Sequence, residues 1–347
     1  MSRAWRRLLC AALAGAIVVA TTTAHAGDPA AEFYAGKTVR VLVGFAAGGG
    51  YDLYARTLGR YLGKHIPGEP TVVVQNTPGA GSLKVVNYLY NAAPRDGTVL
   101  ATFARGIVFE PLLGHTEGTQ FDAARFNWIG SIANEVSVCA LMRSSGIATF
   151  ADMEKTPFRI GASGVGADSD IFPVVLRNLF HLPMKLVTGY QGGAEMVLAM
   201  QRHEIDGRCG WSWTSLISRD KAMLDGRDIA VTLQIALTKH EDLPDVPLVM
   251  DLVRDPQQLA ALRLLVSRQN IARPFAAPPD VPAERVAALR GAFDAVMRDP
   301  DFIAETRKLG LEVRPVAGTE VQKLFAEISA APAEALALAA QLVKEGL

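Results

Sequence analysis

The chain has 347 residues, half of them hydrophobic, and its 35 lysines and arginines are balanced by 35 aspartates and glutamates. Proteins that bind nucleic acids usually carry a clustered basic excess, so this balance argues against a nucleic-acid partner. The length is typical of two domains.

The N-terminus has the three parts of a secretory signal peptide. Three arginines come first (Arg3, Arg6 and Arg7), and an apolar run of 13 residues follows over Leu8–Ala20. A membrane-spanning helix needs about 20 apolar residues, so this run is too short for an anchor. Residues 24–26, Ala-His-Ala, then supply the small-x-small pattern of a cleavage site. We therefore predict a cleavable signal peptide over residues 1–26 and secretion to the periplasm.

Short β-branched runs alternate with helical stretches in the rest of the chain. Strands are predicted at Val39–Phe45, Thr71–Gln75 and Thr98–Phe103, with helices at Asp52–His65 and Ser82–Asn91. The pattern then restarts, with strands at Phe126–Ile132, Val136–Met142, Phe158–Ala162, Lys185–Val187 and Ile229–Gln234, and helices at Phe150–Lys155 and Ser169–Phe180. The C-terminal part is mostly helical, most clearly at Pro282–Asp299 and Asp301–Leu309. This alternation predicts α/β architecture in two lobes with a helical tail.

A glycine-rich loop follows a strand and precedes a helix at two places. Val39–Phe45 leads into AAGGGYD (46–52), and Phe158–Ala162 leads into SGVGADSD (163–170). Glycine lets backbone N–H groups approach a ligand closely, and a helix N-terminus favours an anion. Taken singly, either loop could equally be a tight turn without a ligand. Together they predict one small anion held between two lobes, without need of a catalytic base or a metal.

The motifs of common enzymes and cofactor sites are not matched. Gly48–Gly50 lacks the following Gly-Lys-Ser/Thr of a phosphate-binding loop and the spacing of a dinucleotide fingerprint. After Ser163, valine stands where a hydrolase elbow needs its second glycine. His203 and Glu204 are adjacent, but no second histidine follows at helical spacing. We therefore predict a binding protein with no catalytic residues, no cofactor and no metal.

Short motifs occur in order along nearly the whole chain: GGGYD (48–52), NTPGAG (76–81), AAPRDGTVL (92–100), ASGVG (162–166), GYQGG (189–193), LPDVP (243–247) and LGLEV (309–313). In this order they resemble the extracytoplasmic receptors of tripartite tricarboxylate transporters, also called Bug receptors. Each motif alone is weak, and their common register makes the resemblance specific.

The resemblance implies a two-lobed periplasmic binding protein fold of the type II kind, in which each lobe is a mixed sheet flanked by helices and a hinge joins the lobes. We expect residues 27–129 and 249–347 to form the first lobe and residues 130–248 the second. Such a receptor captures a small organic acid and delivers it to membrane transporter subunits. The alternative is a periplasmic sensor subunit that presents the same kind of ligand to a signalling protein. In either case we expect a monomer.

The resemblance also implies that the two glycine loops grip one carboxylate of the ligand from opposite lobes. The predicted ligand-binding residues of the loops are Gly48, Gly49, Gly50, Tyr51, Asp52, Ser163, Gly164, Val165, Gly166 and Ser169. The chain departs from the family at Tyr51, which replaces a small hydroxyl residue, and at Ala167 and Asp170, where serine and histidine are common. These departures argue against carrying over citrate as the ligand.

The segment DGRCGWSWTS (206–215) departs most from the family, which usually has a short apolar run and an aspartate there. Trp211 and Trp213 would share one face of an extended segment, either as an aromatic wall of the site or within the core. Arg105 and Arg208 are either counter-charges for a second carboxylate or ordinary surface arginines. The predicted site includes Arg105, Trp211 and Trp213.

Two cysteines follow the predicted signal peptide, Cys139 and Cys209. An oxidising compartment permits a disulfide between them. A chain of this size needs no covalent staple, so the sequence favours two small buried thiols.

Overall fold

The computed structural model describes residues 28–114, 117–164 and 166–344. The predicted signal peptide and Val165 lie outside these residues. Within them, no helix combines the length and apolar character that crossing a membrane requires.

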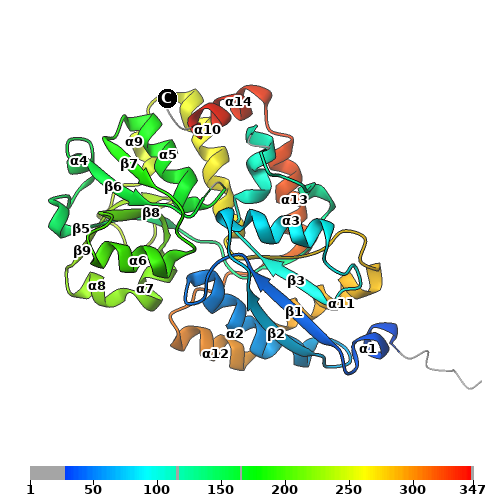
Figure 1. Cartoon of the computed structure of the whole chain (residues 1–347). Helices are drawn as coiled ribbons and strands as arrows, with labels where there is room; N and C mark the ends of the chain where they lie inside the picture. The colour runs from blue at the N-terminus through cyan, green and yellow to red at the C-terminus, as the bar shows by residue number, and fades with distance from the viewer. Residues whose placement is uncertain (1–27, 115–116, 165, 345–347) are drawn as a thin grey trace, which may run out of the picture.

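Two β-sheets organise the described chain (Figure 1). The first has six strands in the order β11-β4-β10-β3-β1-β2, and the second has five in the order β7-β6-β8-β5-β9. The strands of the first sheet are β1 (Thr38–Val43), β2 (Thr71–Asn76), β3 (Val99–Thr102), β4 (Asn127–Ser131), β10 (Pro274–Ala277) and β11 (Val316–Ala317). Those of the second are β5 (Ser137–Met142), β6 (Phe158–Gly161), β7 (Met184–Val187), β8 (Gly207–Ser212) and β9 (Ile229–Ile235).

Both sheets are mixed, as predicted. Strand β1 pairs in parallel with β2 and β3, whereas β10 runs antiparallel to β3 and β4. Likewise, β6 is parallel to β7 and β8, and β5 is antiparallel to β8 and β9. Along the chain, β5 and β10 are the first strands after each passage from one sheet to the other. The mixed character therefore follows from a chain that leaves the first sheet and later returns to it.

Helices flank both sheets. Helices α2, α3, α11 and α13 contact strands of the first sheet, and α5 and α6 contact strands of the second. The α-helices are α1 (Pro29–Tyr34), α2 (Gly50–His65), α3 (Leu83–Asn91), α4 (Phe150–Met153), α5 (Asp168–Phe180), α6 (Gly193–Gln201), α7 (Trp213–Arg219), α8 (Lys221–Asp225), α9 (Val249–Leu252), α10 (Pro256–Val266), α11 (Ala283–Val296), α12 (Pro300–Lys308), α13 (Gly318–Ser329) and α14 (Ala333–Leu342). Short 3₁₀ helices are η1 (Ala80–Ser82), η2 (Ile107–Leu113), η3 (Ala123–Arg125), η4 (Arg143–Ser145) and η5 (Ser267–Ile271).

Local sequence chemistry sets several helix starts. Before α12, the Asp299 carboxylate accepts hydrogen bonds from the amides of Asp301 and Phe302. Pro300 stands at the first helical position, where its missing N–H costs nothing. The predicted helices at 282–299 and 301–309 are accordingly present as α11 and α12.

The predicted boundary between residues 129 and 130 falls inside a strand. All of β4 pairs with β10 and β11 of the first sheet, and the chain reaches the second sheet only with β5. We therefore propose that the first crossing between lobes occupies residues 132–136.

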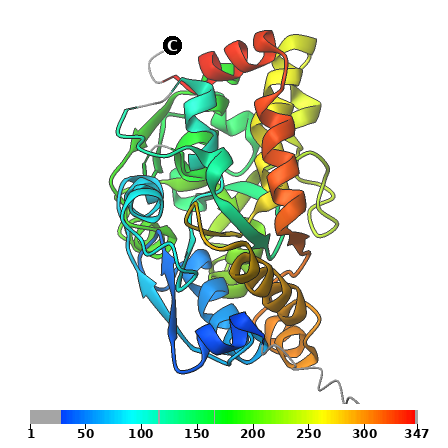
Figure 2. The ribbon, with the colours of Figure 1, turned by 90° about the vertical axis from the view of Figure 1, so that its right-hand side faces the viewer.

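The second predicted boundary, between residues 248 and 249, also disagrees with how the helices pack. Helices α9, α10 and α14 were expected in the first lobe, but Val249, Leu262 and Leu342 share one buried cluster with Phe172 of the second. Their apolar faces are covered by that lobe, and α14 lies against α10, as Figure 2 shows. We therefore propose that the return crossing occupies residues 267–273 and that the C-terminal helix spans back to the second lobe.

Cys139 in β5 and Cys209 in β8 form a disulfide, and both are fully buried. The sequence favoured free thiols, and this expectation is wrong. The two cysteines are 70 residues apart in sequence, but β5 and β8 are neighbouring antiparallel strands. The bond therefore ties together two adjacent interior strands of the second sheet.

Candidate functional site

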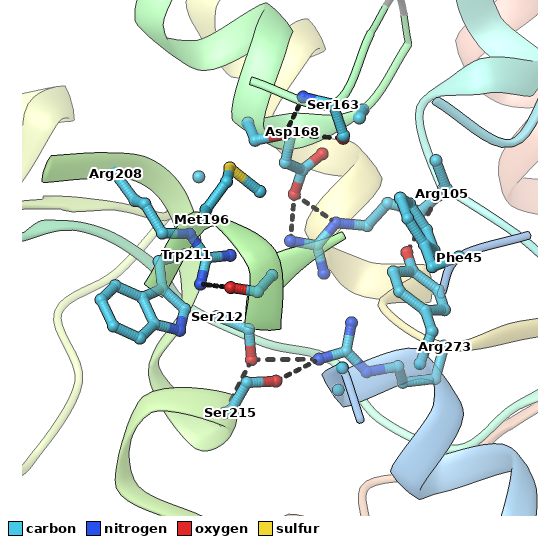
Figure 3. A pocket seen from close by; sticks show the side chains of 18 of the residues that line it. Phe45, Arg105, Ser163, Asp168, Met196, Arg208, Trp211, Ser212, Ser215 and Arg273 are labelled. Atoms are coloured by element: carbon cyan, nitrogen blue, oxygen red, sulfur yellow. Dashed lines mark hydrogen bonds and ion pairs between the residues drawn. The ribbon is translucent and has the colours of Figure 1, made fainter. Parts of the chain in front are cut away.

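A cavity lies between the two lobes, and residues from both line it (Figure 3). It offers ≈ 80 Å³ to the centres of water-sized molecules. This is room for several ordered waters or for a small organic molecule in their place. The lining residues are Phe45, Gly49, Gly50, Tyr51, Ala104, Arg105, Ser163, Ala167, Asp168, Ser169, Gly193, Met196, Arg208, Gly210, Trp211, Ser212, Ser215, Arg219 and Arg273.

Three helices begin at the cavity wall: α2 at Gly50, α5 at Asp168 and α6 at Gly193. None of the three has a side-chain hydrogen bond from its N-cap residue. No N-cap side chain therefore occupies the first amides of these helices, and the positive ends of the helix dipoles meet at the cavity. This arrangement favours an anion.

Asp52 braces the first glycine loop. Its carboxylate accepts hydrogen bonds from the Gly48 amide at 2.9 Å, from Arg56 at 2.9 Å and from Asn76 at 2.8 Å. Burial raises the pKa of Asp52, but these hydrogen bonds outweigh burial and hold the pKa below its usual value. Neither Gly48 nor Asp52 lines the cavity. The predicted residues of this loop that do line it are Gly49, Gly50 and Tyr51.

The second loop presents two hydroxyls. The Ser163 amide donates to the Ser169 hydroxyl at 3.2 Å, and the two hydroxyl oxygens are 2.9 Å apart. Gly164 and Gly166 do not line the cavity, and both have positive φ, +125° and +82°. A Cβ at Gly164 would lie 3.0 Å from a backbone nitrogen of the first lobe, and one at Gly166 would collide with η2. These glycines therefore permit close contact between the lobes.

Tyr51 forms part of the cavity wall, and its hydroxyl already has a hydrogen-bond partner within the protein. Its ring stacks on Phe45 at 4.8 Å, and its hydroxyl accepts a hydrogen bond from the Arg105 amide at 3.1 Å. The Arg273 guanidinium lies 4.6 Å from the ring centroid. Burial raises the pKa of Tyr51, so the phenol stays neutral. The departure from a small hydroxyl residue thus adds an aromatic surface and a contact that orients Arg105.

Arg105 is buried and joins the two lobes. It follows β3 of the first sheet, and its Nε donates to the Asp168 carboxylate at the start of α5 at 2.7 Å. Its Nη2 also contacts Asp168 and donates to the Ser137 hydroxyl at 3.0 Å. Burial lowers the pKa of Arg105, but the carboxylates of Asp168 and Glu135 outweigh burial and raise it. Arg105 is therefore a fixed cation and not a surface arginine.

Arg273 is a second buried cation, which the sequence did not single out. Its Nη2 lies 2.7 Å from the fully buried Glu135 carboxylate. The same nitrogen donates to the hydroxyls of Ser212 and Ser215 at 3.1 Å each. Arg273 is contributed by the return crossing, and the serines by the second lobe, so this group also holds the lobes together. Glu135 lies 3.7 Å from Arg105 as well and links the two cations.

Trp211 and Arg208 form the remaining wall. Trp211 is buried in an apolar cluster of the second lobe and lines the cavity, with the Arg208 guanidinium 4.3 Å from its ring centroid. Trp213 does not line the cavity, and its indole N–H donates to Asp242 at 3.2 Å. The expected shared face fails because β8 ends at Ser212 and α7 begins at Trp213. A helix turns the second tryptophan away from the first.

Sequence reasoning missed several lining residues, chiefly Asp168, Gly193, Met196, Ser212, Ser215 and Arg273. Gly193 stands in the GYQGG motif and Asp168 in the second glycine loop, each at the start of a helix, and both could have been found there. Arg273 and the two serines carry no local signal, because distant segments bring them together. Across the described ranges, no group of three or more histidine, cysteine, aspartate and glutamate side chains could hold a metal ion.

Two mixed α/β lobes with a cavity between them are the fold of the two-lobed periplasmic binding proteins. No protein-family model matches the chain. A UPF0065 protein of Bordetella pertussis is 20% identical over 306 residues, which cover 86% of each chain. The structure of the periplasmic binding protein BugD matches with a TM-score of 0.70 at 20% identity, covering 88% of this chain and 96% of that chain. MatC of Rhodopseudomonas palustris, solved with bound malate, matches with a TM-score of 0.68 at 18% identity, covering 89% and 99%.

These matches confirm the predicted resemblance to the Bug receptors in sequence and in fold.

Proposed function

We propose that the protein is a periplasmic receptor that captures a small organic carboxylate between its lobes and delivers it to a membrane transporter of the tripartite tricarboxylate type. The predicted signal peptide and the resemblance to periplasmic binding proteins support the location. The malate bound to MatC supports the ligand class.

The observation that carries this proposal is the electrostatic character of the cavity. Four arginines line it (Arg105, Arg208, Arg219 and Arg273), against one carboxylate, Asp168. Three uncapped helix N-termini add partial positive charge at the same wall. An anion in this cavity meets backbone amides, hydroxyls and guanidinium groups, all of which are donors.

Closure of the lobes supplies the signal for delivery. The Ala46 amide of the first loop donates to the Gln191 carbonyl of the second lobe at 3.0 Å, beside the ion pair of Arg105 with Asp168. These contacts exist only when the lobes are together. A ligand that binds both walls therefore favours the closed shape, which a membrane partner can distinguish from the open one.

The experiment is a thermal-shift and calorimetric screen of the purified protein against mono-, di- and tricarboxylic acids and aromatic acids. A micromolar ligand at millimolar concentration stabilises the protein by about 4 kcal/mol, which shifts the unfolding midpoint clearly. Recovery of the ligand chemically unchanged after long incubation is expected of a receptor and excludes turnover. A flat panel with folded protein contradicts the carboxylate assignment.

Delivery is tested separately, with the two membrane subunits of such a transporter reconstituted in vesicles. Uptake of the ligand that requires the loaded receptor supports the transport role. Ligand binding without uptake, together with a ligand-dependent complex with a signalling protein, would identify the sensor alternative.

A further inference from the structure

Arg208 is a buried cation of the cavity without a carboxylate partner. Arg105 and Arg273 each have an acidic side chain within 4 Å, Asp168 and Glu135 respectively. Arg208 is only 7% exposed, yet no carboxylate of the described residues lies within 4 Å of its guanidinium. Burial lowers the pKa of Arg208 to about 9, and the field of Asp220 offsets this only in part. The site therefore holds a positive charge that the described chain does not neutralise.

The donors of Arg208 are only partly used. Nη1 donates to the Gly193 carbonyl at 3.2 Å, whereas Nε is buried without a hydrogen-bond partner. One face of the guanidinium lies over the Trp211 indole, which fixes its plane. Figure 3 shows the group reaching over this ring toward the cavity. The edge of the guanidinium, rather than its covered face, is thus left for a ligand, and a carboxylate accepts two parallel N–H donors from such an edge.

Two residues near Arg208, Gly193 and Asp220, favour a carboxylate as the ligand group that Arg208 binds. A Cβ on Gly193 would lie 3.0 Å from the Arg208 guanidinium, so the start of α6 adds its positive dipole end beside the arginine. Asp220 is the acid whose field reaches Arg208, but burial raises the pKa of its carboxyl and its Oδ2 has no hydrogen-bond partner. An external carboxylate is a better partner for Arg208 than this distant, partly buried acid.

We propose that Arg208, held by Trp211, is a specificity-determining residue that binds a second carboxylate of the ligand and so selects dicarboxylates over monocarboxylates. The inference rests on the proposed function, in which the glycine and serine loops at the starts of α2 and α5 hold the first carboxylate. The second carboxylate belongs to the second lobe alone, because Arg208, Trp211 and Gly193 all come from that lobe.

The test compares acids of equal carbon skeleton by calorimetry: butanoate with succinate, hexanoate with adipate, and 4-methylbenzoate with terephthalate. We expect the wild-type protein to bind the dicarboxylate of at least one pair 10- to 100-fold more tightly, the range of a charge-assisted hydrogen bond. Arg208→Met keeps an unbranched stem on the indole and removes the charge. It should abolish the preference by weakening the dicarboxylate of that pair 10- to 100-fold more than the monocarboxylate. Arg208→Lys keeps the charge without the two-donor edge and should retain only part of the preference.

Two variants serve as controls. Arg285 also lies over an aromatic ring, with its guanidinium 3.5 Å from the Phe33 centroid, but it does not line the cavity. Arg285→Met should leave the preference unchanged. Asp220→Asn should leave it unchanged or increase it, because it removes the competing negative field.

The outcomes separate the two proposals. If no acid binds the wild-type protein, the proposed function is wrong and the inference falls with it. If acids bind but each pair binds equally, or if Arg208→Met weakens both members of a pair alike, the receptor function stands and the role of Arg208 is refuted. If Asp220→Asn loses the preference as Arg208→Met does, Asp220 positions the arginine and the uncompensated-charge argument is wrong.

Discussion

Replacing Gly50 by alanine tests whether ligand binding requires the lobe contact seen here. Gly50 opens α2 in the first lobe, and a Cβ added there would lie 2.2 Å from the Ser215 hydroxyl oxygen of the second lobe. An ordinary contact needs more than 3.4 Å, so the lobes or Ser215 must move by about 1 Å. Ser215 cannot retreat freely, because its hydroxyl accepts a hydrogen bond from Arg273 at 3.1 Å.

The magnitude follows from the cost of overpacking, about 1–3 kcal/mol. This strain acts only on the closed form, so we expect Gly50→Ala to weaken ligand binding by about 5- to 150-fold while the open protein keeps its stability. Calorimetry with the best acid of the screen measures the affinity, and thermal unfolding without ligand measures the stability.

The control is Gly291→Ala, since Gly291 lies within α11 and an added Cβ meets nothing within 4 Å. It should leave binding unchanged and raise stability by about 0.4–1 kcal/mol. Wild-type affinity in Gly50→Ala would refute the reasoning, because the ligand would then bind without closure of the lobes.

Three further predictions concern the site and its support. Ser163→Ala removes a cavity hydroxyl that lies 2.9 Å from the Ser169 hydroxyl. It should weaken ligand binding by about fivefold, because one hydrogen bond contributes about 1 kcal/mol, and the circular dichroism spectrum should not change. The double variant Cys139→Ala with Cys209→Ala opens a covalent loop of 70 residues, and it should lower the free energy of unfolding in urea by about 4 kcal/mol. Unlike that of the wild type, the stability of this variant should not respond to a reductant. Hydrogen bonds from neighbouring basic side chains hold the pKa of Asp299 far below its usual value, so its stabilisation is present above about pH 4 and is lost as the pH falls through the folded pKa. Asp299→Asn should therefore flatten the acid limb of the stability curve, and an unchanged limb would exclude this carboxylate as its cause.

The loops that line the cavity were predictable where strand, glycine loop and helix start follow one another in sequence. The loops at 46–52 and 163–170 meet at one cavity, and Gly49, Gly50, Tyr51, Ser163 and Ser169 line it. Other predicted loop residues do not line the cavity. Asp52 turns back to the Gly48 amide and Arg56, and the glycines at 164 and 166 face the other lobe. A sequence motif predicts where a loop lies. Its contacts within the folded protein, including those with the opposite lobe, decide which of its residues line the cavity.

The sequence alone determined the alternation of strands and helices, the two glycine loops and the family resemblance, because each depends on residues that are close in the chain. The tertiary structure decided the pairing of Cys139 with Cys209, the separation of Trp211 from Trp213, and the meeting of Arg273 with Glu135. Each of these depends on which strands become neighbours or on where a strand gives way to a helix. The charge balance of the cavity belongs to this second group, because it is summed over side chains from both lobes and from the proposed return crossing. The same is true of Arg208, whose residue type was visible in the sequence but whose lack of a carboxylate partner among the described residues is a property of the fold.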